Sequence, residues 1–123
     1  VVYIAKEMGA TPDVIRSLAP KSVTTPIAME VTKAVGGIPS LTAAVVVCVG
    51  LMCAVCGYKT MGFARVKSPV AQGLSMGTAA HALGTATSMD VSRVHGAYAS
   101  LGLTLNGIFT ALLTPSILPM LNI

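Results

Sequence analysis

Three hydroxyl side chains gather in the stretch PKSVTTPIAMEV, residues 20–31, of a sequence that is otherwise mostly aliphatic. Thr25 and Pro26 form a helix-start signal, and Ser22 and Thr24 come just before it. The first turn of such a helix presents free backbone amides and the positive end of the helix dipole, which suit a carboxylate or another small anion. The alternative is that these hydroxyls only cap a helix at a membrane surface, with the neighbouring lysine reaching the lipid headgroups.

A histidine among glycines and threonines forms the second candidate, GTAAHALGT at residues 77–85. His81 lies in a long window without charged residues, with Thr78 and Thr85 on either side. Because ionisable groups are costly at membrane depth, His81 is predicted to act as a substrate donor or a proton relay. The alternative is a hydrogen bond to a neighbouring helix.

Other chemistry is weakly represented. Cys53 and Cys56 form a CxxC pair and Cys48 lies nearby, but no histidine or second cysteine pair is close enough in sequence to complete a metal site. We therefore expect small, buried apolar thiols, with no metal and no cofactor. Phosphate-binding loops, nucleophile elbows and zinc-protease motifs are missing, and four acidic residues leave little room for acid–base catalysis, so the sequence predicts a protein that is not an enzyme.

The composition indicates a membrane protein. Of the 123 residues, 54% are hydrophobic and only 10% are charged, and the mean hydropathy is +0.79. Every charged residue lies outside the windows 34–58, 68–89 and 94–123, each of which is long enough to cross a bilayer. The net charge of +4 does not indicate nucleic-acid binding, because aromatic residues make up only 4% of the chain. A basic loop at 59–67 is predicted to be cytoplasmic.

The elements that hold these residues are predicted to be helices, two of them interrupted. One helix should run over 12–19, stop before Pro20, and resume at 25–26 until the glycines at 36–37. Residues 41–58 form the plainest spanning helix, 68–89 a helix rich in small residues that can unwind at 77–85, and 94–121 a last span kinked from Leu112. The predicted fold is an all-α polytopic membrane protein with two spanning helices and two interrupted (broken or re-entrant) helices.

Four further polar residues receive predictions. Glu30 and Lys33 are expected to be solvated at the membrane face, with binding of a coupling cation or proton as the alternative for Glu30. Asn106 is expected to form hydrogen bonds across helices. His95 is expected to be interfacial, near Asp90 and Arg93.

Three strings resemble the LrgB/CidB family of bacterial inner-membrane proteins. They are LAPKSVTTPIAMEVTKAVGGIPSLTA at 18–43, KSPVAQGLSMGTAAHALGTA at 67–86, and the final GAYASLGLTLNGIFTALLTPSILP. The resemblance covers this chain but only the C-terminal half of the family. It implies that residues 1–123 are the C-terminal part of one polytopic transmembrane domain, and we expect the other half to supply a matching inverted repeat.

The resemblance implies a multi-pass protein of the bacterial inner membrane and offers two functions for it. One is a transporter of small monocarboxylates such as glycolate, glycerate or pyruvate; the other is a holin- or antiholin-like modulator of murein hydrolase export and autolysis. Expected partners are the lipid bilayer, a small carboxylate, a small LrgA/CidA-type membrane protein and further copies of the chain, with no nucleic acid. The predicted substrate-binding residues are Ser22, Thr24, Thr25, Pro26, Gly77, Thr78, His81, Gly84 and Thr85.

Overall fold

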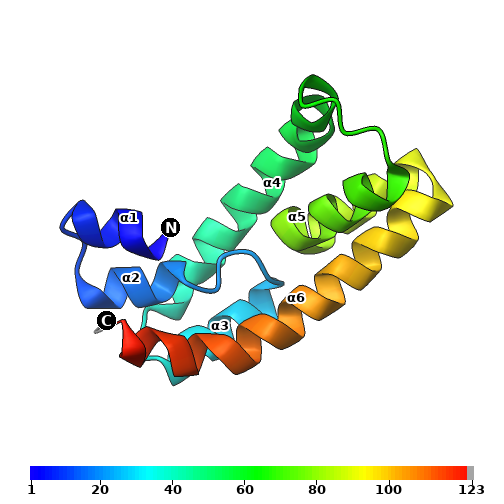
Figure 1. The fold of residues 1–123 in the computed structure, drawn as a ribbon. Helices are drawn as coiled ribbons and strands as arrows, with labels where there is room; N and C mark the ends of the chain where they lie inside the picture. The colour runs from blue at the N-terminus through cyan, green and yellow to red at the C-terminus, as the bar shows by residue number, and fades with distance from the viewer. Residues whose placement is uncertain (122–123) are drawn as a thin grey trace.

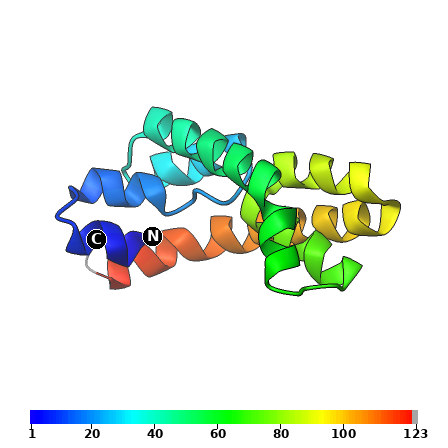
Figure 2. The same cartoon turned by 90° about the horizontal axis from the view of Figure 1, so that it is seen from above.

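The computed structural model describes residues 1–121, which form six α-helices. They are α1 (Val2–Glu7), α2 (Pro12–Leu18), α3 (Thr25–Ala34), α4 (Pro39–Phe63), α5 (Pro69–Val91) and α6 (Arg93–Met120). Helices α4 and α6 are the long elements, and α2 and α3 lie between them at the end of the molecule where the two termini lie (Figures 1 and 2). Lys6 Nζ donates a hydrogen bond to the Leu121 carbonyl at 3.2 Å, so the first and last helices are joined there.

Prolines define where most of these helices begin. Pro12, Pro26, Pro39 and Pro69 each occupy the first turn of a helix. Proline fits there because its fixed φ is helical and its missing N–H has no intrahelical partner at a helix start. The predicted starts of α2, α3 and α5 are therefore confirmed.

Helices α4 and α6 are long and apolar enough to cross a bilayer. Only 17% of the apolar window of each is buried within the chain, so most of their surface must be covered by lipid or by other protein. Helix α4 continues through Lys59 to Phe63, and the predicted loop at 59–67 is therefore wrong in its first part. A lysine can remain in the last turns of such a helix because its aliphatic stem lies along the helix while its ammonium group reaches water.

Helix α5 reverses direction at His81. His81 has φ 46° and ψ −132°, which is not helical, so two helical arms meet at this residue. The second arm folds back on the first and packs closely against it: a Cβ added at Gly84 would collide with the Met76 carbonyl oxygen. Both ends of α5 consequently lie near the start of α6 (Figures 1 and 2).

Residues 19–24 separate α2 from α3. This connection extends toward the middle of the molecule, and α3 returns from there (Figure 1). Val23 within it is fully buried and clusters with Ala28 of α3 and Val46 of α4. A hydrogen bond of 2.8 Å between the Thr32 and Thr42 hydroxyls fixes α3 against α4.

Small residues allow α5 and α6 to pack closely. A Cβ at Gly77 would overlap the Ala99 carbonyl oxygen, one at Gly73 would lie 2.5 Å from the His95 carbonyl oxygen, and one at Gly102 would lie 2.8 Å from the Leu74 carbonyl oxygen. Such spacings require glycine, as in other closely packed membrane helices. The backbones of α5 and α6 therefore approach each other closely along the glycine-bearing side of α5.

Two predictions about the apolar windows need correction or restriction. The cysteines form no disulfide within the described chain, but Cys48 and Cys56 are exposed and Cys53 is half-buried, so the prediction of buried thiols is wrong. The reason is that α4 is apolar on every side and buries only one stripe, made of Thr42, Val46 and Gly50. The expected kinked end at 112–123 is helical through Met120, and its last two residues lie outside the described part.

Candidate functional site

The first predicted segment ends in an uncapped helix start. Thr24 precedes α3 as its N-cap residue, yet among the described residues it makes no side-chain capping hydrogen bond. Ser22 and Thr24 are half-buried, and the Ser22 hydroxyl accepts a hydrogen bond of 2.7 Å from Lys21 Nζ. The geometry therefore differs from the capping alternative, and the first turn of α3 keeps free amides.

The second predicted segment centres on the bend at His81. Its imidazole is 4% exposed, and Nε2 donates a hydrogen bond of 2.9 Å to the Val46 carbonyl of α4. The carbonyl of His81 accepts a hydrogen bond of 3.0 Å from the Thr85 hydroxyl. A hydroxyl thus satisfies a backbone group at the bend, which is the condition under which interrupted helices persist in membranes.

Gly50 makes room for the histidine on α4. A Cβ at this position would lie 2.5 Å from His81 Cε1 and 2.6 Å from Nε2. The bond to Val46 therefore depends on a glycine one helical turn further along α4. The alternative prediction, that His81 bonds a neighbouring helix, describes its contact in this structure.

Asn106 joins the two predicted segments. Its amide nitrogen Nδ2 donates hydrogen bonds to the Ser22 carbonyl at 2.8 Å and to the Thr78 carbonyl at 3.1 Å. Ser22 lies in the connection between α2 and α3, whereas Thr78 lies three residues before the bend of α5. The expectation that Asn106 forms hydrogen bonds across helices is confirmed, but its position between both segments was not predicted.

The other predicted binding residues differ in their surroundings. Gly77 and Gly84 serve close packing, against α6 and against the first arm of α5 respectively. Pro26 is exposed at the start of α3, and Thr25 beside it is half-buried. The Thr78 hydroxyl bonds the Leu74 carbonyl of its own helix at 2.8 Å, so Thr78 contacts Asn106 through its backbone.

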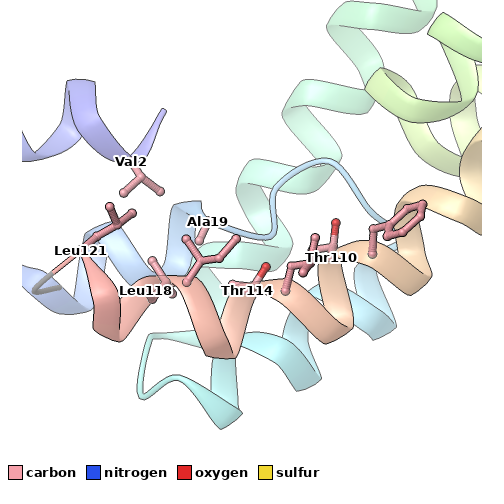
Figure 3. A pocket seen from close by; sticks show the side chains of 9 residues that line it. Val2, Ala19, Thr110, Thr114, Leu118 and Leu121 are labelled. Carbon is pink, nitrogen blue, oxygen red and sulfur yellow. The ribbon is translucent and has the colours of Figure 1, made fainter.

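Two surface cavities flank the last turns of α6. The first, of about 260 Å³, lies between α6 and the residues Val2 and Ala19, and its walls include Phe109, Leu113 and Ile117 (Figure 3). The second, of about 330 Å³, is lined by Arg16, Ala34, Val35, Pro115, Leu118 and Pro119. Neither of these two cavities, both within residues 1–121, includes a predicted binding residue in its walls.

A separate polar cluster lies where α5 begins and α6 begins. His95 Nε2 donates to Gln72 Oε1 at 2.9 Å, and Gln72 Nε2 donates to the Val66 carbonyl at 2.7 Å. The other ring nitrogen of His95 is 2.8 Å from the Ser92 hydroxyl, and the Tyr58 ring packs edge-on against the imidazole at 5.9 Å. His95 is only 9% exposed, because its amide and hydroxyl partners hold the ring against α5 and α6. Its interfacial position in a membrane stays a prediction.

The charged residues at the other end are solvated. Lys33 Nζ and Glu30 Oε1 form an ion pair at 2.6 Å, and both side chains are exposed, as predicted. Exposed pairs of this kind contribute roughly 0–1 kcal/mol. They do not organise the two interrupted segments.

Two long apolar helices with little internal burial, the bend inside α5, and the hydrogen bonds of Asn106 to both predicted segments together indicate a helical membrane protein. Residues 1–120 match the LrgB-like family. The chain belongs to this family, which confirms the resemblance seen in the sequence.

Individual relatives agree with this family assignment. The chain is 41% identical over 118 residues to a protein of Haemophilus influenzae that carries no functional name, covering 96% of this chain and 51% of the relative. It is 37% identical to the antiholin-like protein LrgB of Bacillus mycoides, covering 99% of this chain and 54% of that protein, and 35% identical to the protein of the same name in Bacillus cereus, covering 99% and 53%. The chain thus spans about half the length of these relatives. No solved structure matches it.

Proposed function

We propose that this chain is part of an antiholin-like membrane protein that modulates murein hydrolase export and autolysis. The observation that carries the proposal is the family match over residues 1–120, together with relatives named antiholin-like protein LrgB. The geometry is compatible with regulation through assembly, because the apolar windows of α4 and α6 are mostly uncovered and offer large faces to other membrane helices.

The setting we propose is the bacterial inner membrane, with several crossings. The short connection after α4 carries Arg65 and Lys67, and Lys59 lies in the last turns of that helix, so this end should face the cytoplasm. The connection at residues 19–24 and the bend at His81 are the two proposed interruptions of membrane helices. Residues 1–123 would form part of one transmembrane domain, without enzymatic activity, that assembles with a small LrgA/CidA-type protein and with further copies of itself.

Deletion and complementation test this function. Removing the complete protein from its host should raise autolysis and the murein hydrolase activity released into the medium. Expression of the unaltered protein should return both to the level of the undeleted host. The Gly77→Ala variant should not restore them, because a Cβ there overlaps the Ala99 carbonyl oxygen. Gly62→Ala is the matched control, since a Cβ there has nothing within 4 Å. Equal hydrolase release with and without the protein would contradict the proposal.

A specific observation favours a second candidate, a carrier of small monocarboxylates. Two interrupted segments share one residue, Asn106, and the helix start beside the first has no side-chain cap. Discontinuous helices that meet in the membrane, with helix N-termini directed at an anion, are a substrate-binding arrangement of secondary transporters. The proposed binding residues are the nine predicted from the sequence, with the amides of α3 replacing part of the hydration of the carboxylate.

Uptake by proteoliposomes tests the carrier candidate. Labelled glycolate or pyruvate should enter vesicles that contain the complete protein, and the rate should saturate with concentration. Thr24→Val and Thr25→Val should lower uptake, whereas Thr104→Val should not, because the exposed Thr104 hydroxyl only bonds the Ser100 carbonyl of its own helix. Leakage that does not saturate and tolerates larger solutes would instead support the holin-like function.

A further inference from the structure

Four landmarks recur along this chain at one spacing. Pro12 and Pro69, which begin the two interrupted segments, are 57 positions apart. The interruptions themselves, Thr24 before α3 and His81 in α5, are again 57 positions apart. The same spacing separates Phe63 from Met120, the last residues of α4 and α6.

The fourth landmark is a pair of glycines in equivalent contacts. Gly50 of α4 and Gly107 of α6 are also 57 positions apart. A Cβ at Gly107 would lie 3.3 Å from Ile27 Cδ1, and one at Gly50 would lie 2.9 Å from Leu83 Cδ1. Ile27 and Leu83 both come two or three residues after an interruption, so each spanning helix receives an aliphatic side chain from the interrupted segment of the other half.

Hydrogen bonds also connect the spanning helix of each half to the interrupted segment of the other half. Asn106 of α6 donates to the Ser22 carbonyl in the first interrupted segment, at 2.8 Å. His81 in the second interrupted segment donates to the Val46 carbonyl of α4, at 2.9 Å. Each half of the chain is therefore bonded to the other at its interruption.

The two halves have opposite directions. Tyr58 near the end of α4 packs on His95 near the start of α6, with ring centroids 5.9 Å apart. At the other end, residues 34–35, just before α4, share a cavity wall with Pro115 and Pro119 of α6. Helices α4 and α6 are thus antiparallel, and the interrupted segments approach each other from opposite ends of the molecule (Figures 1 and 2).

We infer that residues 12–63 and residues 69–120 are two copies of one structural unit, inserted in the membrane with opposite orientations, whose re-entrant segments meet at Asn106 within the bilayer. The sequence led us to expect the partner of an inverted repeat outside this chain, whereas these contacts place both copies inside it. In transporters built from such repeats, one repeat rocks against the other, so that a fixed site between them is exposed to each side in turn. This last consequence rests on the carrier candidate; the orientation of the units does not.

Labelling of single cysteines tests the orientation in the complete protein. In a background with Cys48, Cys53 and Cys56 replaced by alanine, one cysteine is introduced at each of four positions that flank the re-entrant segments: Thr11, Ile38, Ser68 and Val91. Intact cells and inverted vesicles are then treated with a membrane-impermeant maleimide. Variants are retained if their elution in size-exclusion chromatography matches that of the cysteine-free parent.

The inference predicts that Thr11→Cys and Ile38→Cys react from one side, and that Ser68→Cys and Val91→Cys react from the other. Reaction of Thr11→Cys and Ile38→Cys from opposite sides would overturn it, since the first segment would then cross the membrane. Reaction of all four from one side would overturn the opposite orientation. Because no transport is measured, these outcomes are independent of the carrier candidate and of the antiholin-like function.

Discussion

Replacing Gly50 by alanine should disrupt the contact between α4 and the bend of α5. The added Cβ would lie 2.5 Å from His81 Cε1 and 2.6 Å from Nε2, so the imidazole must move and its 2.9 Å bond to the Val46 carbonyl must lengthen or break. Overpacking costs about 1–3 kcal/mol, and a buried hydrogen-bonding group left without its partner costs about 1–3 kcal/mol. Because one displacement causes both effects, we expect the free energy of unfolding to fall by about 2–4 kcal/mol.

The assay is reversible unfolding of the complete protein in detergent micelles, with Gly62→Ala as the control. Gly62 lies in the same helix and a Cβ there meets nothing within 4 Å, so this substitution should be neutral or should stabilise by up to about 1 kcal/mol. Equal unfolding free energies for the two variants would refute the role assigned to Gly50. A His81→Ala variant as stable as the unaltered protein would also refute it, because the contact between the imidazole and α4 would then contribute nothing to stability.

Three other substitutions probe separate features. Gly77→Ala should prevent α5 and α6 from packing, because the new Cβ overlaps backbone that cannot move aside; the measurement is recovery of folded protein by size-exclusion chromatography, and normal recovery would contradict the packing. Thr24→Ala should change the unfolding free energy by less than about 0.5 kcal/mol, whereas loss of a working N-cap costs about 1 kcal/mol. Gln72→Leu should destabilise by about 1–3 kcal/mol, because the Val66 carbonyl and His95 Nε2 both lose their partner, and hydrogen exchange should rise near the start of α6.

Local signals in the sequence were sufficient to find most helix boundaries. Prolines at 12, 26 and 69 fix helix starts through their own backbone geometry, and the glycines at 36–37 end α3 in a positive-φ turn at Gly36. Charge-free windows identified α4 and α6, because the length that crosses a bilayer is a local property of the chain. The end of α4 was misplaced because a lysine interrupts the apolar pattern without interrupting the helix.

Long-range geometry could not be obtained in this way. The bond between Asn106 and Ser22 joins residues 84 positions apart, and nothing in the apolar pattern of α6 marks that partner. Glycines at 77–84 indicated that α5 can unwind, but the direction of the chain after His81 depends on contacts with α4. The two proposed units share landmarks such as Pro12 and Pro69 but few identical residues, so sequence similarity does not mark them as a repeat. The predicted binding residues remain a prediction.

Ser92 alone separates α5 from α6, and its hydroxyl accepts a hydrogen bond from the His95 amide at 3.3 Å while contacting the His95 ring. A connection of one residue allows little independent movement. The second arm of α5 and the beginning of α6 should therefore move together as one rigid unit. The link between α4 and α5 is longer, residues 64–68, and includes Arg65 at a φ of 56°. Movement of the bend at His81 would therefore be transmitted to α6, and it would break the 2.9 Å hydrogen bond from His81 to the Val46 carbonyl of α4.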